Sequence, residues 1–242
     1  TVRGVLRNDA GVSDFMLDPA AGLAYVRITM LGEETASEVG RAIALLEKRG
    51  LRGLVLDLRD TPGGMLTQAV RVADHFLDEG VIVTSVTRDG RKVIKASSGV
   101  ATRVPLVVLA NDRTASSAEI LLAALVDNGR ATFVGQRSFG KGRIQEKIAL
   151  PAGYGGIVIT TGTFERPAGG TFDRHDKAAG GRAGIAPGEG LEVVIEGEEL
   201  ERWREQMERL DGAFILTADE QRQGADRVLD RAIEVLRAKA KP

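Results

Sequence analysis

Residues 111–145 read NDRTASSAEILLAALVDNGRATFVGQRSFGKGRIQ, and this stretch decides the fold. The apolar run PLVVLA at 105–110 precedes it and predicts a strand. After a turn of small residues, Glu119 to Val126 has apolar residues on all sides, which predicts a buried helix. A second strand, ATFV at 131–134, leads into a loop that carries Lys141. A serine at such a strand-to-helix turn would expose its hydroxyl at the helix N-terminus, and the lysine would lie at the same end of the sheet.

A nucleophilic serine in this turn needs a base, because its hydroxyl must lose a proton as it attacks. Histidine is the usual base, but His75 lies in a helix pattern and His175 in a glycine-rich charged loop, and neither has a serine partner nearby in the sequence. A lysine can serve if burial lowers its pKa toward neutrality from about 10.4. Lys141, between Phe139 and the apolar strand from Ile144, is the candidate. The alternative is that Lys141 is an ordinary exposed turn residue.

The lysine loop also resembles a phosphate-binding loop, but two features argue against nucleotide binding. Residues 135–142, GQRSFGKG, nearly match GxxxxGK[ST], but Gly142 has no hydroxyl to hold magnesium. Residues 144–150, IQEKIAL, alternate apolar and polar side chains and so predict a strand, whereas the motif requires a helix. We therefore expect no nucleotide partner.

Strands and helices alternate along the rest of the chain, which predicts an α/β fold with a largely parallel sheet. Residues 1–20 are expected to hold a short strand at 2–6, a turn and a loop. Further strands are expected at 23–31, 54–58 and 156–167, a hairpin around Asp89-Gly90, and helices at 35–48, 66–77, 196–210 and 225–240. On the helix at 196–210, Trp203 and Met207 share one face, which favours docking on the body of the protein.

The carboxyl ends of two predicted parallel strands carry the turns at 61–64 and 114–117. Right-handed crossovers place such turns at the same end of a sheet, where ligands of these folds bind. We therefore expect the fold to bring Gly63 toward Ser116.

Composition excludes several classes of function. The 242 residues are 43% apolar and 28% charged, which is typical of a globular protein with a sizeable core. A net charge of −1 provides no electrostatic attraction to nucleic acid or to an anionic membrane. No apolar run approaches the roughly 20 residues of a membrane span. The chain has no cysteine, which is compatible with an oxidising compartment, and we find no signal-peptide pattern in it.

Four blocks of sequence resemble the carboxy-terminal processing peptidases, also called tail-specific proteases, of family S41. These blocks are YVRIT (25–29), GLVLDLRDTPGG (53–64), TASSAEI (114–120) and FGKGRIQ (139–145). Each block alone is weak, but as an ordered set they are specific, and with the segments between them they cover most of residues 20–166. The resemblance implies a core like that of crotonase and Clp protease, a ββα core with flanking helices and a small strand-rich N- and C-terminal portion.

The resemblance also implies the site residues. Ser116 would be the nucleophile and Lys141 the general base, with Gln145 orienting the lysine. The backbone N–H groups of Gly63 and Ser117 would form the oxyanion hole. Asp127, eleven residues after Ser116, matches a family position that affects activity. No metal or other cofactor is implied.

We expect three regions, of which the resemblance supports the core and the final helix. They are an N-terminal segment at 1–20, a protease core at 21–196 without the PDZ domain that precedes it in the family, and a helical segment at 197–242 packed on the core. The implied function is a serine endopeptidase that cleaves unstructured polypeptides with apolar C-termini. The implied location is extracytoplasmic, in a bacterial periplasm or cell envelope, and the protein could form a homo-oligomer.

Departures from the family pattern leave alternatives open. Ser116 and Ser117 are adjacent, and the family's serine just before the glutamate is Ala118 here. Counting from Glu119 and from Lys141 selects Ser116 as the nucleophile, and the alternatives are Ser117 or an inactive site. Residues 197–225 do not match the family. The alternative function is a non-catalytic module of the same fold that binds peptides or lipophilic ligands, and a crotonase-like acyl-thioester enzyme is a further reading.

Overall fold

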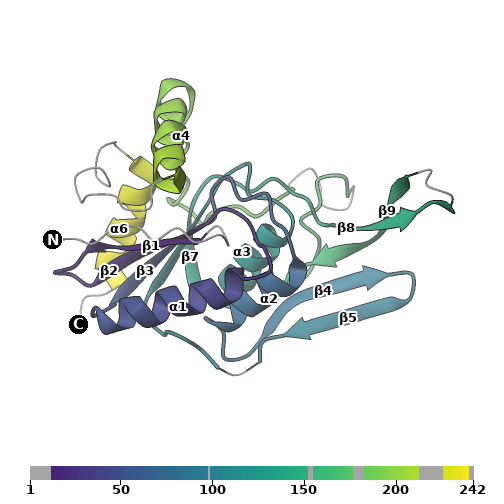
Figure 1. The fold of residues 1–242 in the computed structure, drawn as a ribbon, viewed down its shortest axis with the longest axis horizontal. Helices are drawn as coiled ribbons and strands as arrows, with labels where there is room; N and C mark the ends of the chain where they lie inside the picture. Colours follow the sequence, from purple (N-terminus) through teal and green to yellow (C-terminus); the bar gives the residue numbers. More distant parts are fainter. Residues whose placement is uncertain (1–11, 98, 152–154, 177–182, 213–225, 240–242) are drawn as a thin grey trace.

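A five-stranded sheet carries the fold (Figure 1). The computed structural model describes residues 12–97, 99–151, 155–176, 183–212 and 226–239. The strand order is β1-β2-β3-β6-β7; β2, β3, β6 and β7 are parallel, and β1 is antiparallel to β2. The five strands are β1 (Val12–Asp18), β2 (Leu23–Ile28), β3 (Gly53–Asp57), β6 (Leu106–Ala110) and β7 (Ala131–Gly135). Every residue of β2, β3 and β6 is buried, as expected of parallel strands that are covered on both faces.

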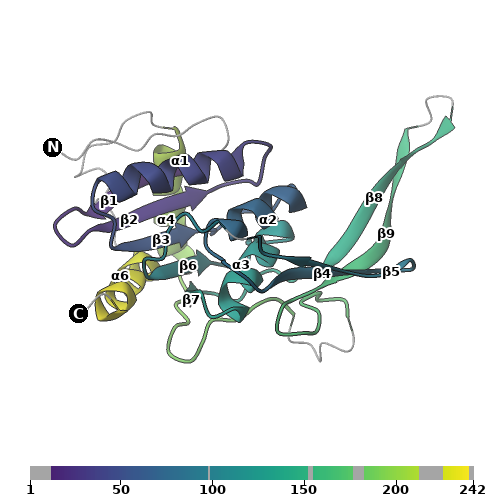
Figure 2. The same cartoon turned by 90° about the horizontal axis from the view of Figure 1, so that it is seen from below.

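Helices cover both faces of this sheet (Figures 1 and 2). Along β3, Leu54 and Leu56 belong to one apolar cluster and Val55 to the other, because successive side chains of a strand point to opposite faces. The first cluster includes residues of α1 (Thr35–Lys48), α2 (Leu66–Asp74) and α3 (Ser117–Asp127). The second includes residues of α4 (Gly197–Gly212) and α6 (Arg227–Lys239). The sheet is therefore the middle of three layers.

A second, antiparallel sheet has the strand order β5-β4-β9-β8. Its strands are β4 (Val81–Thr87), β5 (Gly90–Lys95), β8 (Arg143–Ala149) and β9 (Gly156–Glu165). The β8–β9 and β4–β5 hairpins extend away from the three-layer body, with α2 and α3 at their base (Figures 1 and 2). The lysine loop joins the two sheets, because it runs from β7 of the first into β8 of the second.

The structure confirms most predicted elements and corrects one. The helix predicted at 35–48 has the same bounds in the structure, and the hairpin around Asp89-Gly90 is β4–β5. Residues 12–18 were expected to be a loop, but they form β1 and add an edge strand to the main sheet. Polar Ser13 and Asp14 interrupt the apolar pattern there, and pairing with β2 determines the conformation. The strand predicted at 2–6 lies outside the described residues.

The C-terminal residues that the structure describes are helical and pack on the core. Trp203 and Met207 of α4 are 3% and 6% exposed and belong to the second apolar cluster, so the docking predicted for this helix is confirmed. α6 contacts β3, β6 and β7. In the described part of the chain, none of the helices combines the length and the apolar character that crossing a bilayer requires.

Candidate active site

Ser116 lies at a sharp turn between β6 and α3. Its φ of 58° and ψ of −125° are rare for a residue with a side chain, and such a conformation costs about 1–3 kcal/mol, so it persists only where its surroundings enforce it. The turn is held by its neighbours: Ala115 N donates to Thr61 O (3.0 Å), and the Thr114 hydroxyl donates to Leu58 O (2.8 Å). Because both acceptors follow β3, the turn of Ser116 is fixed against the end of that strand.

A buried carboxylate connects the serine turn to the lysine loop. Glu119 Oε2 accepts hydrogen bonds from Ser116 N (2.9 Å) and Lys141 N (2.8 Å). Its Oε1 accepts from the Ser138 hydroxyl and from Gly140 N, both at 2.6 Å. The Glu119 side chain is fully buried; burial raises the pKa of its carboxyl, and these donors act in the opposite direction. Sequence reasoning used Glu119 only as a landmark, although a single acidic residue near the start of an apolar helix was a usable signal.

Ser116 and Lys141 are close in the structure. Because their backbone nitrogens donate to the same oxygen of Glu119, these nitrogens lie no more than about 5.7 Å apart, the sum of the two hydrogen-bond lengths. The Lys141 side chain is exposed, so the structure does not show the burial that the sequence argument requires of a lysine base. Within the described residues no hydrogen bond joins it to the Ser116 side chain. On the far side of the loop, Asp173 accepts hydrogen bonds from Gly142 N (3.1 Å) and Arg143 Nε (3.2 Å).

Gly63 approaches the serine turn closely. Its φ is 102°, and a Cβ placed there would lie 2.7 Å from Ala115 O and 3.0 Å from Ser116 Cβ. Only glycine fits both the backbone conformation and the space. Among the described residues, no backbone acceptor pairs with Gly63 N or Ser117 N, and both residues are buried. The Ser117 hydroxyl is buried and has no hydrogen-bond partner in the described part of the chain.

Gln145 and Asp127, the two other predicted catalytic residues, lie outside the turn and the loop that carry Ser116 and Lys141. Gln145 is exposed on β8, four residues after Lys141 and next to a register shift between Ile144 and Gln145. Asp127 is the last residue of α3, at the opposite end of the helix from Ser116, roughly 16 Å along its axis. Its carboxylate forms an ion pair with Arg166 and accepts a hydrogen bond from Ala168 N (3.1 Å). The fold therefore does not bring Asp127 to Ser116.

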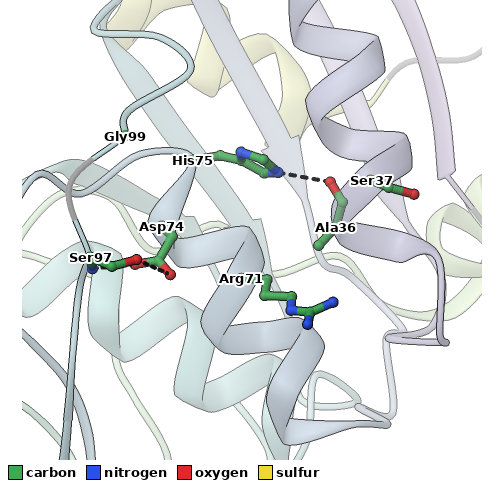
Figure 3. Close-up of a pocket in the computed structure, with 7 residues that line it drawn as sticks. All are labelled: Ala36, Ser37, Arg71, Asp74, His75, Ser97 and Gly99. Atoms are coloured by element: carbon green, nitrogen blue, oxygen red, sulfur yellow. Dashed lines mark hydrogen bonds between the residues drawn. The ribbon is translucent and has the colours of Figure 1, made fainter.

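The two histidines lie elsewhere. His75 lines a surface cavity of about 350 Å³ between α1 and α2 (Figure 3), and its Nε2 lies 2.8 Å from Ala36 O. The same cavity is bordered by Ser97, whose backbone N–H and hydroxyl donate to the Asp74 carboxylate. His175 lies in the segment that follows Asp173, to which its backbone N–H donates. His75 therefore links two helices, and no contact connects either histidine with Ser116 among the described residues.

No group of three or more histidine or acidic side chains in the described ranges is arranged to hold a metal ion. The arrangement instead offers a hydroxyl on a strained turn, an amine on the adjacent loop and two backbone N–H donors. These are the groups that acyl transfer through a serine ester requires.

Known proteins resemble this chain over much of its length. The carboxyl-terminal-processing protease of Synechocystis sp. is 40% identical over 178 residues, which are 73% of this chain and 40% of that protein. The carboxy-terminal processing protease CtpA of Bacillus subtilis is 43% identical over 125 residues, 51% of this chain and 27% of that protein. The chain thus spans less than half the length of these relatives.

Solved structures share the fold. The photosystem II D1 C-terminal processing protease is 30% identical with a TM-score of 0.66, over 77% of this chain and 49% of that one. Mature CPAF, at 15% identity, shares the fold alone, with a TM-score of 0.57 over 89% of this chain and 56% of that one. The family model described as Peptidase family S41 matches residues 22–187. That match covers more than half of the sequence, and the chain therefore belongs to peptidase family S41.

Proposed function

We propose that this chain is the catalytic core of a serine endopeptidase in which Ser116 is the nucleophile and Lys141 the general base. One observation carries the proposal: Ser116 N and Lys141 N donate to the same Glu119 oxygen. This shared acceptor brings the backbone of the lysine loop beside the serine turn. The relatives of this chain include carboxyl-terminal-processing proteases, which supports this reaction class.

In the proposed reaction, the uncharged amine of Lys141 takes the proton of the Ser116 hydroxyl as the oxygen attacks a peptide carbonyl. A C–O bond forms, and the carbonyl electrons move onto the oxygen. The tetrahedral intermediate collapses by breaking the C–N bond, and Lys141 returns the proton to the leaving amine. Water then attacks the ester in the same way, which releases the new carboxyl terminus and restores Ser116.

The backbone N–H groups of Gly63 and Ser117 would hold the negative oxygen of the intermediate. Loss of one donor from such a hole typically lowers kcat by about 10²–10³. The absence of a Cβ at Gly63 supports this role, because it leaves room beside Ser116. Ser117 N is also at the start of α3, where the helix dipole favours a negative charge.

Two further predicted residues would act around this centre. Gln145, near the start of β8, would orient the Lys141 amine by accepting its hydrogen bond. Asp127 would act from a distance, because its ion pair with Arg166 fastens the end of α3 to the end of β9. We place Asp127 among positioning residues for this reason.

The proposed substrates are unstructured polypeptides with apolar C-termini. The similarity to the photosystem II D1 C-terminal processing protease supports a polypeptide substrate processed at its carboxyl end. We also propose an extracytoplasmic location, since curated relatives come from bacteria and, in Arabidopsis thaliana, carry the description chloroplastic.

The test uses the purified chain and an unstructured peptide ending in apolar residues, with products identified by mass spectrometry. We expect cleavage by the unchanged chain and its loss in Ser116→Ala and Lys141→Ala. Ser117→Ala is the matched control, because it removes the adjacent hydroxyl and keeps the backbone N–H. Cleavage that survives Ser116→Ala would exclude the assigned nucleophile. Absence of cleavage in every form, with retained peptide binding, would favour the non-catalytic module.

A further inference from the structure

A buried ion cluster connects the C-terminal helices to the segment that carries Gly63. Arg59 lies directly before residues 60–64, which we call the oxyanion loop. The Arg59 side chain is almost fully buried, at 1% exposure. A guanidinium cannot lose its charge in a protein, so it must find acceptors inside.

The first acceptor is local. Arg59 Nε lies 3.0 Å and 2.9 Å from the two oxygens of Asp57, and Arg59 N donates to Asp57 Oδ1 at 2.8 Å. The hydroxyl of Tyr25 donates to Asp57 Oδ2 at 2.6 Å, and Arg27 lies 3.7 Å from Asp57 Oδ1. These contacts fix one side of the guanidinium to the end of β3.

The second acceptor comes from 167 positions later in the chain. Arg59 Nη1 and Nη2 donate to Asp226 Oδ1 and Oδ2 at 2.9 Å and 2.8 Å, which is a bidentate pair. Asp226 precedes α6, and its Oδ1 also accepts a hydrogen bond from Leu229 N at 3.1 Å. One carboxylate therefore caps the N-terminus of α6 and holds Arg59.

The α4 helix adds two contacts on the same side. The Trp203 ring stacks on the Arg59 guanidinium, 4.6 Å from its central carbon to the ring centroid. Arg204 Nε lies 3.8 Å from Asp60 Oδ2, a carboxylate of the oxyanion loop itself. Figure 1 shows α4 and α6 together on one side of the main sheet. The C-terminal helices thus reach both Arg59 and Asp60.

The position of Arg59 bears directly on Gly63. Asp60, between them, has a φ of 56° and is fastened to Asn111 by hydrogen bonds of 3.0 Å and 2.8 Å. Gly63 O accepts a hydrogen bond from Leu31 N at 3.0 Å. A strained residue between fixed ends cannot absorb a shift of Arg59 without moving its neighbours.

We propose that Asp226 is a positioning residue: through Arg59, the C-terminal helices set the position of the oxyanion loop. The proposal rests on the proposed function for its catalytic consequence. It gives the segment after residue 196 a role in the reaction without contact with the substrate. The alternative is a buried ion pair that only contributes to stability.

The discriminating variant is Asp226→Asn. Asparagine keeps an oxygen for Leu229 N and for one nitrogen of Arg59, but it turns an NH₂ group toward the other nitrogen. The guanidinium must then shift, while the cap of α6 survives. The matched control is Arg237→Gln. It breaks the exposed ion pair between Arg237 of α6 and Asp18 of β1 (3.1 Å), which is another contact between α6 and the sheet.

Two measurements on the full chain test the proposal. Steady-state cleavage of an unstructured peptide with an apolar C-terminus gives kcat and KM. We expect kcat to fall about 10–100-fold in Asp226→Asn with KM within about threefold, because a displaced donor acts in the transition state, where losing one costs about 10²–10³. Hydrogen–deuterium exchange, which needs no activity, should become faster at residues 58–66 in Asp226→Asn and stay unchanged there in Arg237→Gln.

Each outcome decides the proposal. Unchanged exchange at 58–66, or faster exchange with unchanged kcat, would overturn it and leave the stability role. If the unchanged chain does not cleave the peptide, the proposed function fails, and the exchange comparison alone still decides whether Asp226 holds the loop. If Asp226→Asn does not fold, Trp203→Leu replaces it. This variant removes the ring that stacks on the Arg59 guanidinium, and the same two measurements and criteria apply.

Discussion

Replacing Glu119 by glutamine removes the charge that connects the serine turn to the lysine loop. Four donors point at this carboxylate, from Ser116 N, Lys141 N, Gly140 N and the Ser138 hydroxyl. Only an ionised carboxylate accepts from all four, because each of its oxygens can accept two hydrogen bonds. A glutamine has one such oxygen, so its NH₂ group must face two of the donors.

The cost follows from the better of the two amide orientations. In this orientation the glutamine oxygen points toward Ser116 N and Lys141 N, and the NH₂ group faces the Ser138 hydroxyl and Gly140 N. The hydroxyl can rotate to accept a hydrogen bond from the NH₂ group, but the backbone N–H of Gly140 cannot accept one. One buried donor then stays unpaired, at about 1–3 kcal/mol, and the remaining hydrogen bonds lose the strength that a charged acceptor gives. We expect a loss of about 2–5 kcal/mol, a large part of the 5–15 kcal/mol that usually stabilises a domain.

Thermal unfolding and peptide cleavage together measure the effect. For a chain of this length, such a loss lowers Tm by roughly 5–15 °C. We expect kcat to fall at least about tenfold as well, because the two backbone segments are no longer held by one oxygen. Ser138→Ala is the control: it removes one donor to Glu119 and the acceptor of Ile185 N without touching Ser116 or Lys141, and it should change kcat by less than about threefold.

Two results would contradict this reasoning. A Glu119→Gln variant with unchanged Tm would show that the four donors do not depend on the charge. If Ser138→Ala lost as much kcat as Glu119→Gln, the loss could not be attributed to the connection that Glu119 makes between Ser116 and Lys141.

Three further predictions test other parts of the structure. Gly63→Ala places a methyl group 2.7 Å from Ala115 O at a φ of 102°, so we expect kcat to fall by about 10²–10³ in the cleavage assay, and unchanged kcat would refute the assigned hole. Trp203→Ala should cost about 3–5 kcal/mol in urea unfolding, since the ring is 3% exposed; a cost under about 1 kcal/mol would contradict the docking of α4. Burial favours the neutral Asp57 carboxyl, but the charges of Arg59 and Arg27 prevail and hold its pKa below the ordinary value. The ionised carboxylate therefore contributes stability above its unfolded-state pKa, and this contribution is lost as pH falls through the folded-state pKa. The urea midpoint of the unchanged chain should drop on acidification below about pH 4, and the drop should be less steep in Asp57→Asn.

The sequence alone determined the alternation of strands and helices and the place of the reactive turns. Continuous apolar runs predict buried parallel strands, and the crossover rule then puts the turns after β3 and β6 at one end of the sheet. The close approach of Gly63 to Ser116 confirms that step, and it needed only local patterns and chain geometry.

The tertiary structure decided which charges are buried and what holds them. Arg59 and Asp226 look like ordinary polar residues in the sequence, and even for Glu119 a pattern of side chains does not specify which distant donors it will meet. Strand β1 was missed for a related reason: its conformation depends on pairing with β2. Asp127 lies at the far end of α3 from Ser116, since Ser116 directly precedes the helix and Asp127 is its eleventh and last residue. A buried charge is stabilised only by partners that folding brings to it, and these partners come from segments that are remote in the chain.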